Sequence, residues 1–152
     1  MINYSRQKID NEDIKNVIKS LKSDWLTTGP LISNFEKKIN FLVNSKYCSV
    51  VNSATSGLHL ACLALGVKKG DYVWTSSNTF VSSANCALLC GAKIDLCDIE
   101  LNTFNIDVNK LEKKLILAKK RKKLPKVIIP VHFSGYPCDL KKIYKLSKKF
   151  KF

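Results

Sequence analysis

The fold of this chain is decided by residues 48–60, which read CSVVNSATSGLHL. An apolar run ends at Val51, small polar residues continue to Gly57, and an apolar helical pattern follows. This order predicts a buried strand, a tight turn and the start of a helix. Ser53, Thr55 and Ser56 are favourable N-cap residues, because their hydroxyls accept hydrogen bonds from the free N–H groups of a first helical turn.

The residues of this turn, taken alone, allow two interpretations. The free N–H groups and the positive end of the helix dipole can hold a phosphate group. Alternatively, the turn is an ordinary strand-to-helix junction with a serine cap, and this is the interpretation that the segment alone favours. The rest of the chain has to decide between them.

Outside this stretch, short apolar segments alternate with helical patterns. Strands are predicted at residues 48–51, 72–75, 93–96 and 127–131, and helices at 10–23, 32–43, 56–65, 80–90, 108–120 and 140–149. Apolar strands alternating with helices of about ten to fifteen residues are typical of a mostly parallel sheet with helices on both faces. The prediction is an α/β fold with about four strands, fewer than the five or six of an average sheet.

Polar loops follow the predicted strands. They are residues 52–57, 76–80, 98–105 and 132–137, and all are rich in Ser, Thr, Asn, Gly, His or Asp. Ligands of open α/β sheets bind beyond the carboxyl ends of the strands. These loops therefore form the candidate rim of an active site.

Length and composition indicate one globular domain. The chain has 152 residues, of which 45% are hydrophobic and 25% charged, and this is ordinary for a folded protein. No apolar run approaches the roughly 20 residues of a membrane span, and the amino terminus lacks a signal-peptide core. We expect a soluble, cytoplasmic protein without a membrane partner.

The formal net charge of +14 suggests a nucleic-acid partner, because clustered Lys and Arg neutralise phosphates. Against this, the lysines are distributed over most predicted helices, and the dense run at residues 113–126 has no interleaved aromatic residues. A compositional bias of the source explains the charge more simply. We expect no nucleic-acid partner.

The cysteines are interpreted as small buried hydrophobic residues. None forms a C-x-x-C pair, and no His or acidic residue lies near the Cys86–Cys90 pair in sequence, so no metal site is expected. The six are Cys48, Cys62, Cys86, Cys90, Cys97 and Cys138.

Several motifs coincide in one order along the chain. They are LTTGP at 26–30, NSATSGLHL at 52–60, NTFVSSAN at 78–85, GAK at 91–93, Asp98 with TFNID at 103–107, and VHFSG at 131–135. Their order and spacing resemble the amino-terminal part of the DegT/DnrJ/EryC1/StrS family of sugar-nucleotide aminotransferases. The resemblance covers essentially all 152 residues.

The resemblance implies the aspartate-aminotransferase (type I) fold and pyridoxal phosphate as cofactor. Residues 1–152 would be part of the large domain, with helices and a substrate loop in about 1–45 and βα units in about 46–152. The opening residues 4–9 resemble most the branch of pseudaminic acid biosynthesis, which aminates carbon 4 of a UDP-linked 4-keto-6-deoxy-N-acetylhexosamine. Glutamate is the implied amino donor, and a homodimer the implied assembly.

Site residues are implied by the same motifs. Thr55 and Ser56, with the Ala54 backbone, would hold the cofactor phosphate, and Phe80 would stack on the pyridine ring. The nucleotide-sugar would be contacted by Tyr4, Trp25, Leu26, Thr27, Thr28 and Gly29.

Some of these residues have ordinary alternatives. Phe80 would otherwise be a core aromatic residue, and Trp25 a surface anchor. His132 and Gly135 match a family motif without an assigned role, and His132 would otherwise be a hydrogen-bonded residue at a strand end.

The sequence departs from the family pattern in two places. Ser76, Ser77 and Asn78 stand where a proline commonly precedes the Thr-Phe pair. The family's Schiff-base lysine and the aspartate that pairs with the pyridine nitrogen lie beyond the matching region, so no catalytic residue is expected here. We therefore expect an inactive amino-terminal fragment of an aminotransferase, or alternatively a stand-alone module that binds nucleotide-sugar or phosphate.

Overall fold

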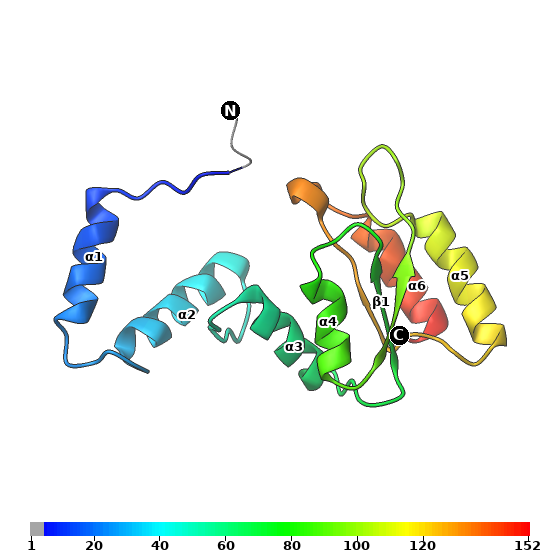
Figure 1. The fold of residues 1–152 in the computed structure, drawn as a ribbon, viewed down its shortest axis with the longest axis horizontal. Helices are drawn as coiled ribbons and strands as arrows, with labels where there is room; N and C mark the ends of the chain where they lie inside the picture. The colour runs from blue at the N-terminus through cyan, green and yellow to red at the C-terminus, as the bar shows by residue number, and fades with distance from the viewer. Residues whose placement is uncertain (1–4) are drawn as a thin grey trace. The chain divides into compact units, whose positions relative to one another are not determined.

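The computed structural model describes residues 5–152 (Figure 1). The chain divides into two compact units, one ending at Val50 and the other running from Val51 to Phe152. The prediction for Tyr4 lies outside the described residues.

The first unit contains two helices, α1 (Asn11–Leu21) and α2 (Pro30–Val43). Asp10 caps α1 by accepting from the backbone N–H groups of Glu12 and Asp13, and the Asp13 carboxylate accepts from the N–H of Asp10. Pro30 opens α2, where its missing N–H costs no hydrogen bond. Both helices lie where the sequence predicts them, and no described residue of this unit is buried.

The second unit is built on three short parallel strands, β1 (Tyr72–Ser76), β2 (Lys93–Cys97) and β3 (Val127–Ile129). Their order in the sheet is β2-β1-β3, with Val73 of β1 opposite Ile94 on one side and Val127 on the other. The helices are α3 (Ala54–Ala64), α4 (Ser82–Leu89), α5 (Val108–Lys120) and α6 (Leu140–Phe150), with a short 3-10 turn at Phe133–Gly135.

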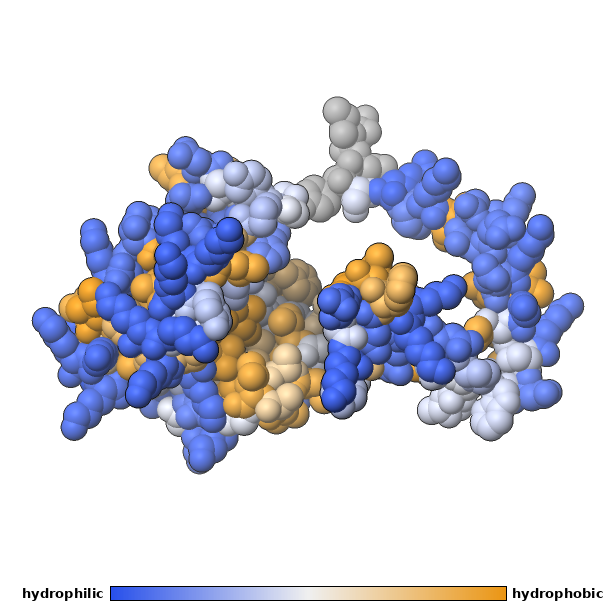
Figure 2. All heavy atoms as spheres, turned by 180° about the vertical axis from the view of Figure 1, so that it is seen from behind, coloured by the Kyte–Doolittle hydropathy of each residue, from blue (hydrophilic) through white to orange (hydrophobic). Residues whose placement is uncertain are grey.

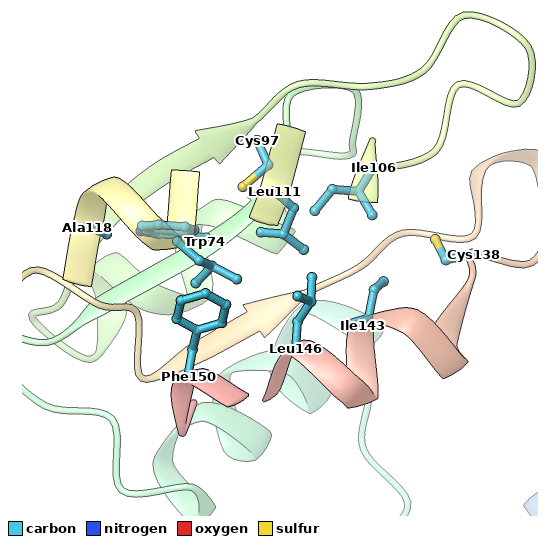
Figure 3. Packing of buried hydrophobic residues seen from close by; sticks show 10 residues of the cluster. Trp74, Cys97, Ile106, Leu111, Ala118, Cys138, Ile143, Leu146 and Phe150 are labelled. Atoms are coloured by element: carbon cyan, nitrogen blue, oxygen red, sulfur yellow. The ribbon is translucent and has the colours of Figure 1, made fainter. Parts of the chain in front are cut away.

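Successive residues of β1 pack on opposite faces of the sheet, as the pleat requires. Val73 packs with Cys62 of α3 and Cys86 of α4. Trp74 packs on the other face with residues of α5 and α6 (Figure 3), among them Leu111, Leu115, Ile143, Leu146 and Phe150. Helices therefore cover both faces, and the predicted α/β class with a parallel sheet is confirmed.

Two strand predictions are wrong. Residues 48–51 form no strand, and the Val50 N–H instead donates to the Glu36 carboxylate, 3.0 Å away. The third strand of the sheet ends at Ile129 rather than at residue 131, because Pro130 has no N–H to donate to a ladder. Residues 5–152 thus form three strands instead of about four.

All six cysteines are free thiols. Cys62, Cys86, Cys97 and Cys138 are buried, so the interpretation as small core residues is confirmed for these four. Cys48 and Cys90 are partly exposed. Among residues 5–152 no cluster of three or more His, Cys, Asp or Glu side chains is suited to hold a metal ion.

Candidate functional site

The strand order creates a topological switch point at the carboxyl end of β1. From β1 the chain passes over one face through α4 to β2, and from β2 it returns over the other face through α5 to β3. The connections after β1 and β3 therefore diverge to opposite faces, and in open α/β sheets ligands bind beyond the carboxyl ends of strands at such a point. Inside the sheet the Thr75 hydroxyl donates to the carbonyl of Ile129 at 2.9 Å and joins the same two strands.

The polar turn before α3 has the geometry of an anion site. Ser53 is the N-cap, and its Oγ accepts from the Ser56 N–H at 3.2 Å. Ser56 Oγ donates to Asn52 Oδ1 at 2.7 Å. The N–H groups of Ala54 and Thr55, at the first two positions of the helix, have no acceptor among the described residues. Two free donors at the positive end of a helix dipole fit a phosphate group.

A hydrogen bond ties this turn to α4, the helix that follows the loop after β1. Thr55 Oγ1 lies 2.7 Å from Oγ of Ser82, a buried residue at the first position of α4. Thr79 Oγ1 donates to Ser83 Oγ at 2.8 Å, which holds the preceding loop against the same helix. The structure thus brings the predicted phosphate residues and the Phe80 loop together.

Phe80 lies at the end of that loop, and 75% of its surface is exposed. The alternative that it is a core aromatic residue is therefore wrong. An exposed ring held beside a polar turn is available to stack on a planar ligand.

The loops after β2 and β3 are joined through Asn105. Its Oδ1 accepts from the Phe133 N–H at 2.8 Å, and its Nδ2 donates to the Tyr136 carbonyl at 2.9 Å. Its side chain is buried, so both ends of the amide are satisfied. His132 Nδ1 accepts from the Cys138 N–H at 2.9 Å, which agrees with the structural alternative for this histidine.

Two ion pairs border these loops. The Lys110 ammonium donates to Asp98 and lowers the pKa of that carboxyl, with a further contribution from the Ile99 N–H. The Lys142 side chain and backbone N–H likewise lower the pKa of Asp139, the N-cap of α6. Both carboxylates are used in capping or pairing.

The predicted substrate residues of the first unit form the connection between α1 and α2. Thr28 has a positive φ of 51°, and Gly29 caps α2. The loop lines a cavity of about 570 Å³ together with the end of α1. The Trp25 side chain is 62% exposed. The predicted contacts at Trp25, Leu26, Thr27, Thr28 and Gly29 thus lie around one concave, largely apolar surface.

The sequence did not predict Ser82 and Asn105 as residues of the site. Both lie inside motifs that the sequence analysis quoted, NTFVSSAN and TFNID. Their partners are 27 and about 30 residues away along the chain, so no local pattern identifies them.

Among the described residues, no helix has the length and apolar character needed to cross a membrane.

Comparison with known sequences identifies a family. The profile of the DegT/DnrJ/EryC1/StrS aminotransferase family matches residues 7–152. The UDP-4-amino-4,6-dideoxy-N-acetyl-beta-L-altrosamine transaminase of Campylobacter jejuni (strain 81-176) is 41% identical over 150 residues, which are 99% of this chain and 39% of that protein. The spore coat polysaccharide biosynthesis protein SpsC of Bacillus subtilis is 39% identical over 95% of this chain and 36% of its own length.

Solved structures show the same fold. The aminotransferase PseC of Helicobacter pylori, involved in the biosynthesis of pseudoaminic acid, is 30% identical with a TM-score of 0.85, over 99% of this chain and 39% of that one. The protein Spr1654 of Streptococcus pneumoniae, solved in its PLP form, is 29% identical with the same TM-score, over 97% of this chain and 36% of that one. The chain thus spans little more than a third of the length of these relatives.

Proposed function

Because this chain belongs to the DegT/DnrJ/EryC1/StrS aminotransferase family, we propose that it supplies the phosphate-binding part of a pyridoxal-phosphate-dependent sugar-nucleotide aminotransferase. The observation that carries the proposal is the hydrogen bond between Thr55 and Ser82. It joins a helix start, whose first two N–H groups have no acceptor among residues 5–152, to the helix that follows the Phe80 loop, at the switch point of a type I fold. The activity, substrates and partners of the whole protein are part of the proposal.

The residues of this chain fit the cofactor chemically. The N–H groups of Ala54 and Thr55 and the hydroxyls of Thr55 and Ser56 would bind its phosphate, and the exposed Phe80 ring would stack on its pyridine ring. When bound, pyridoxal phosphate supplies the electron sink that amino-group transfer needs. The role of this chain in that reaction is to bind and orient the group.

The substrate class follows from the relatives. The Campylobacter transaminase is named for a UDP-linked amino sugar. We propose that the whole protein acts on a UDP-linked 4-keto-6-deoxy-N-acetylhexosamine, with glutamate as the amino donor. The cavity beside residues 25–29 supports this, since it combines an exposed indole with polar Thr side chains. Tyr4 belongs to the same proposed substrate site.

Assembly and location complete the proposal. We expect a cytoplasmic homodimer, because the apolar faces of α1 and α2 offer surface for a second copy. Ile14, Val17, Ile18 and Leu21 of α1 are each 46–66% exposed. We expect no transamination from the 152 residues alone, and no catalytic residue is assigned among them.

The proposal is tested by NMR of the ¹⁵N-labelled chain titrated with pyridoxal phosphate, and with pyridoxal as the control that lacks the phosphate. The expected result is a saturable shift of the Ala54 and Thr55 amide signals with the phosphate ester alone. Equal shifts with both compounds, or shifts elsewhere only, contradict the assignment.

A second measurement separates the proposed aminotransferase part from a stand-alone binding module. UDP-N-acetylglucosamine is added to the chain, and thermal unfolding is followed. A module that binds nucleotide-sugars by itself shows a transition that rises with the ligand concentration. An unchanged transition together with the phosphate-dependent NMR shifts supports the aminotransferase part.

A further inference from the structure

Nearly all of the net positive charge of the chain lies in its last 45 residues. Residues 108–152 contain 15 of the 26 Lys and Arg residues but only 2 of the 12 Asp and Glu residues. The preceding 107 residues hold the other 11 cations and 10 acids, so they are nearly neutral. A compositional bias of the source acts on the whole chain and does not explain this segregation. Lysines do occur on most of the predicted helices, but the excess of cations over acids lies in this last segment.

The two acids of this segment are already neutralised. Glu112 of α5 accepts from Lys149 of α6 at 2.7 Å, and Asp139 pairs with Lys142 at 2.9 Å. Three further lysines, Lys110, Lys114 and Lys126, pair with aspartates outside the segment. The remaining ten cations are exposed and have no ion-pair partner among residues 5–152: Lys113, Lys119, Lys120, Arg121, Lys122, Lys123, Lys141, Lys145, Lys148 and Lys151.

Helix geometry directs these cations outward on one side of the unit. On α6, Lys141, Lys145 and Lys148 follow each other at i, i+4 and i+7, opposite the buried stripe of that helix. On α5, Lys113 and Lys120 lie opposite the buried Leu111, Leu115 and Ala118. Both helices pack on the same face of the sheet, so their lysine stripes point the same way.

Apolar side chains are interspersed in this surface. Ile116 and Leu117 of α5 are 43% and 52% exposed, and Tyr144 of α6 is 61% exposed, between Lys141 and Lys145 in the sequence. Seen from behind in Figure 2, hydrophilic side chains project over the unit that carries these helices, with apolar ones between them.

Helix stability does not account for the pattern. Cations in the last turn stabilise a helix dipole, and this role fits Lys119 and Lys120 of α5 and Lys148 and Lys149 of α6. It does not fit Lys113, Lys141 and Lys145, which lie in earlier turns.

We propose that the outer surface of α5 and α6, with the turn at residues 121–123, docks on the anionic surface of a lipid bilayer. This replaces the expectation of no membrane partner, which was drawn from the lack of an apolar run long enough to span a membrane. Polybasic surfaces are attracted to acidic headgroups, and exposed apolar side chains add contact at the interface. A nucleic acid fits less well. The cations are lysines except for Arg121, whereas planar Arg side chains are preferred for phosphodiesters, and they lie on the outer faces of helices rather than in a groove.

The test is cosedimentation of the chain with vesicles rich in phosphatidylglycerol, and with pure phosphatidylcholine vesicles for comparison. Binding is expected to the anionic vesicles only, and to fall steeply with salt. Replacing Lys113, Lys120, Lys145 and Lys148 by Glu is expected to weaken binding about tenfold or more.

The matched control carries Glu at Lys15, Lys37, Lys38 and Lys68, which are exposed and lie outside the segment. Each set of four Lys→Glu changes lowers the formal net charge from +14 to +6. The control variant is expected to bind like the parent chain. Far-UV circular dichroism verifies that both variants are folded, and a Lys→Gln version of each set replaces any variant that is not.

Three results would overturn the proposal. Equal loss in both variants would show that net charge alone drives binding. Equal binding to neutral vesicles, or none to anionic vesicles at low salt, would exclude headgroup recognition. Displacement of the chain from vesicles by a small amount of polyuridylic acid would assign the surface to nucleic acid instead.

Discussion

Thr55 Oγ1 and Ser82 Oγ lie 2.7 Å apart and join the starts of α3 and α4. Ser82 is buried, whereas Thr55 lies at the surface beside the free N–H groups of the turn. The helix that follows the Phe80 loop thus holds the proposed phosphate site through one hydroxyl pair.

Ser82→Ala is expected to destabilise the chain by about 0.5–1.5 kcal/mol, the net contribution of one neutral hydrogen bond. It is also expected to weaken the phosphate-dependent NMR shifts at Thr55. Ser147→Ala is the matched control, since the Ser147 hydroxyl bonds only the Tyr144 carbonyl in its own helix. Urea unfolding measures the loss of stability, and the NMR titration measures the shifts at Thr55. If both variants show the same stability and the same shifts, Ser82 does not position the phosphate site.

Gly29→Ala is expected to disturb the loop at residues 25–29. A Cβ at Gly29 would lie 2.6 Å from the Cβ of Trp25, a distance that forces the backbone to move. Its φ of −78° is allowed for any residue, so the effect is steric. We expect a loss of about 1–3 kcal/mol, as for overpacking, and a changed emission of the exposed Trp25.

Gly57→Ala is the comparison for that variant. Its new Cβ meets Val51 at 3.4 Å, an ordinary contact, and alanine is favoured over glycine inside a helix by about 1 kcal/mol. Gly57→Ala should therefore unfold at the same or a higher urea concentration than the parent chain. If Gly29→Ala does the same, the close approach to Trp25 has no energetic role.

Asn105→Ala is expected to cost about 2–4 kcal/mol, because it leaves the Phe133 N–H and the Tyr136 carbonyl without their partner. Hydrogen exchange of the residue 132–137 loop should accelerate at the same time. Asn109→Ala, at an exposed position of α5, should change neither quantity. A mild effect of Asn105→Ala, similar to that of Asn109→Ala, would show that the two loops are held by other contacts.

The pKa of Asp139 is expected to rise in Lys142→Met. The Lys142 side chain is the main cause of its lowered pKa, and the variant retains the backbone N–H of residue 142, which bonds the carboxylate at 3.0 Å. A carboxyl with a lowered folded-state pKa stabilises the fold above its ordinary pKa, and this contribution is lost as pH falls through the folded-state value. NMR titration of Asp139 measures the shift, and Lys145→Met, which removes a more distant charge, should leave it in place.

The buried thiols should resist alkylation in the folded chain. Burial, reinforced by the neighbouring Cys86 thiol 3.7 Å away, raises the pKa of Cys62 to about 11, and burial raises that of Cys97 to about 11. Both are therefore protonated and shielded at neutral pH. Maleimide labelling with mass spectrometry should modify the partly exposed Cys48 first and these two only on unfolding.

Much of the fold was predictable, because helices are specified locally. The helix α5 has the predicted bounds of 108–120, and α1 lies within the predicted 10–23, because caps such as Asp10 and Asp107 and the apolar periodicity act within a few residues. Strand pairing is not local. Residues 48–51 have the composition of a buried strand, yet they join no strand of the sheet that residues 5–152 form, and the Val50 N–H donates to Glu36 instead.

The candidate site divides in the same way. Its motifs, its family and the capped turn at Ser53 are properties of contiguous residues, so the sequence by itself determined them. The order β2-β1-β3, the pairing of Thr55 with Ser82 and the exposure of Phe80 were decided only by the tertiary structure. The physical reason is distance along the chain: capping and periodicity act within a few residues, whereas these contacts join residues that only packing on a common sheet brings together.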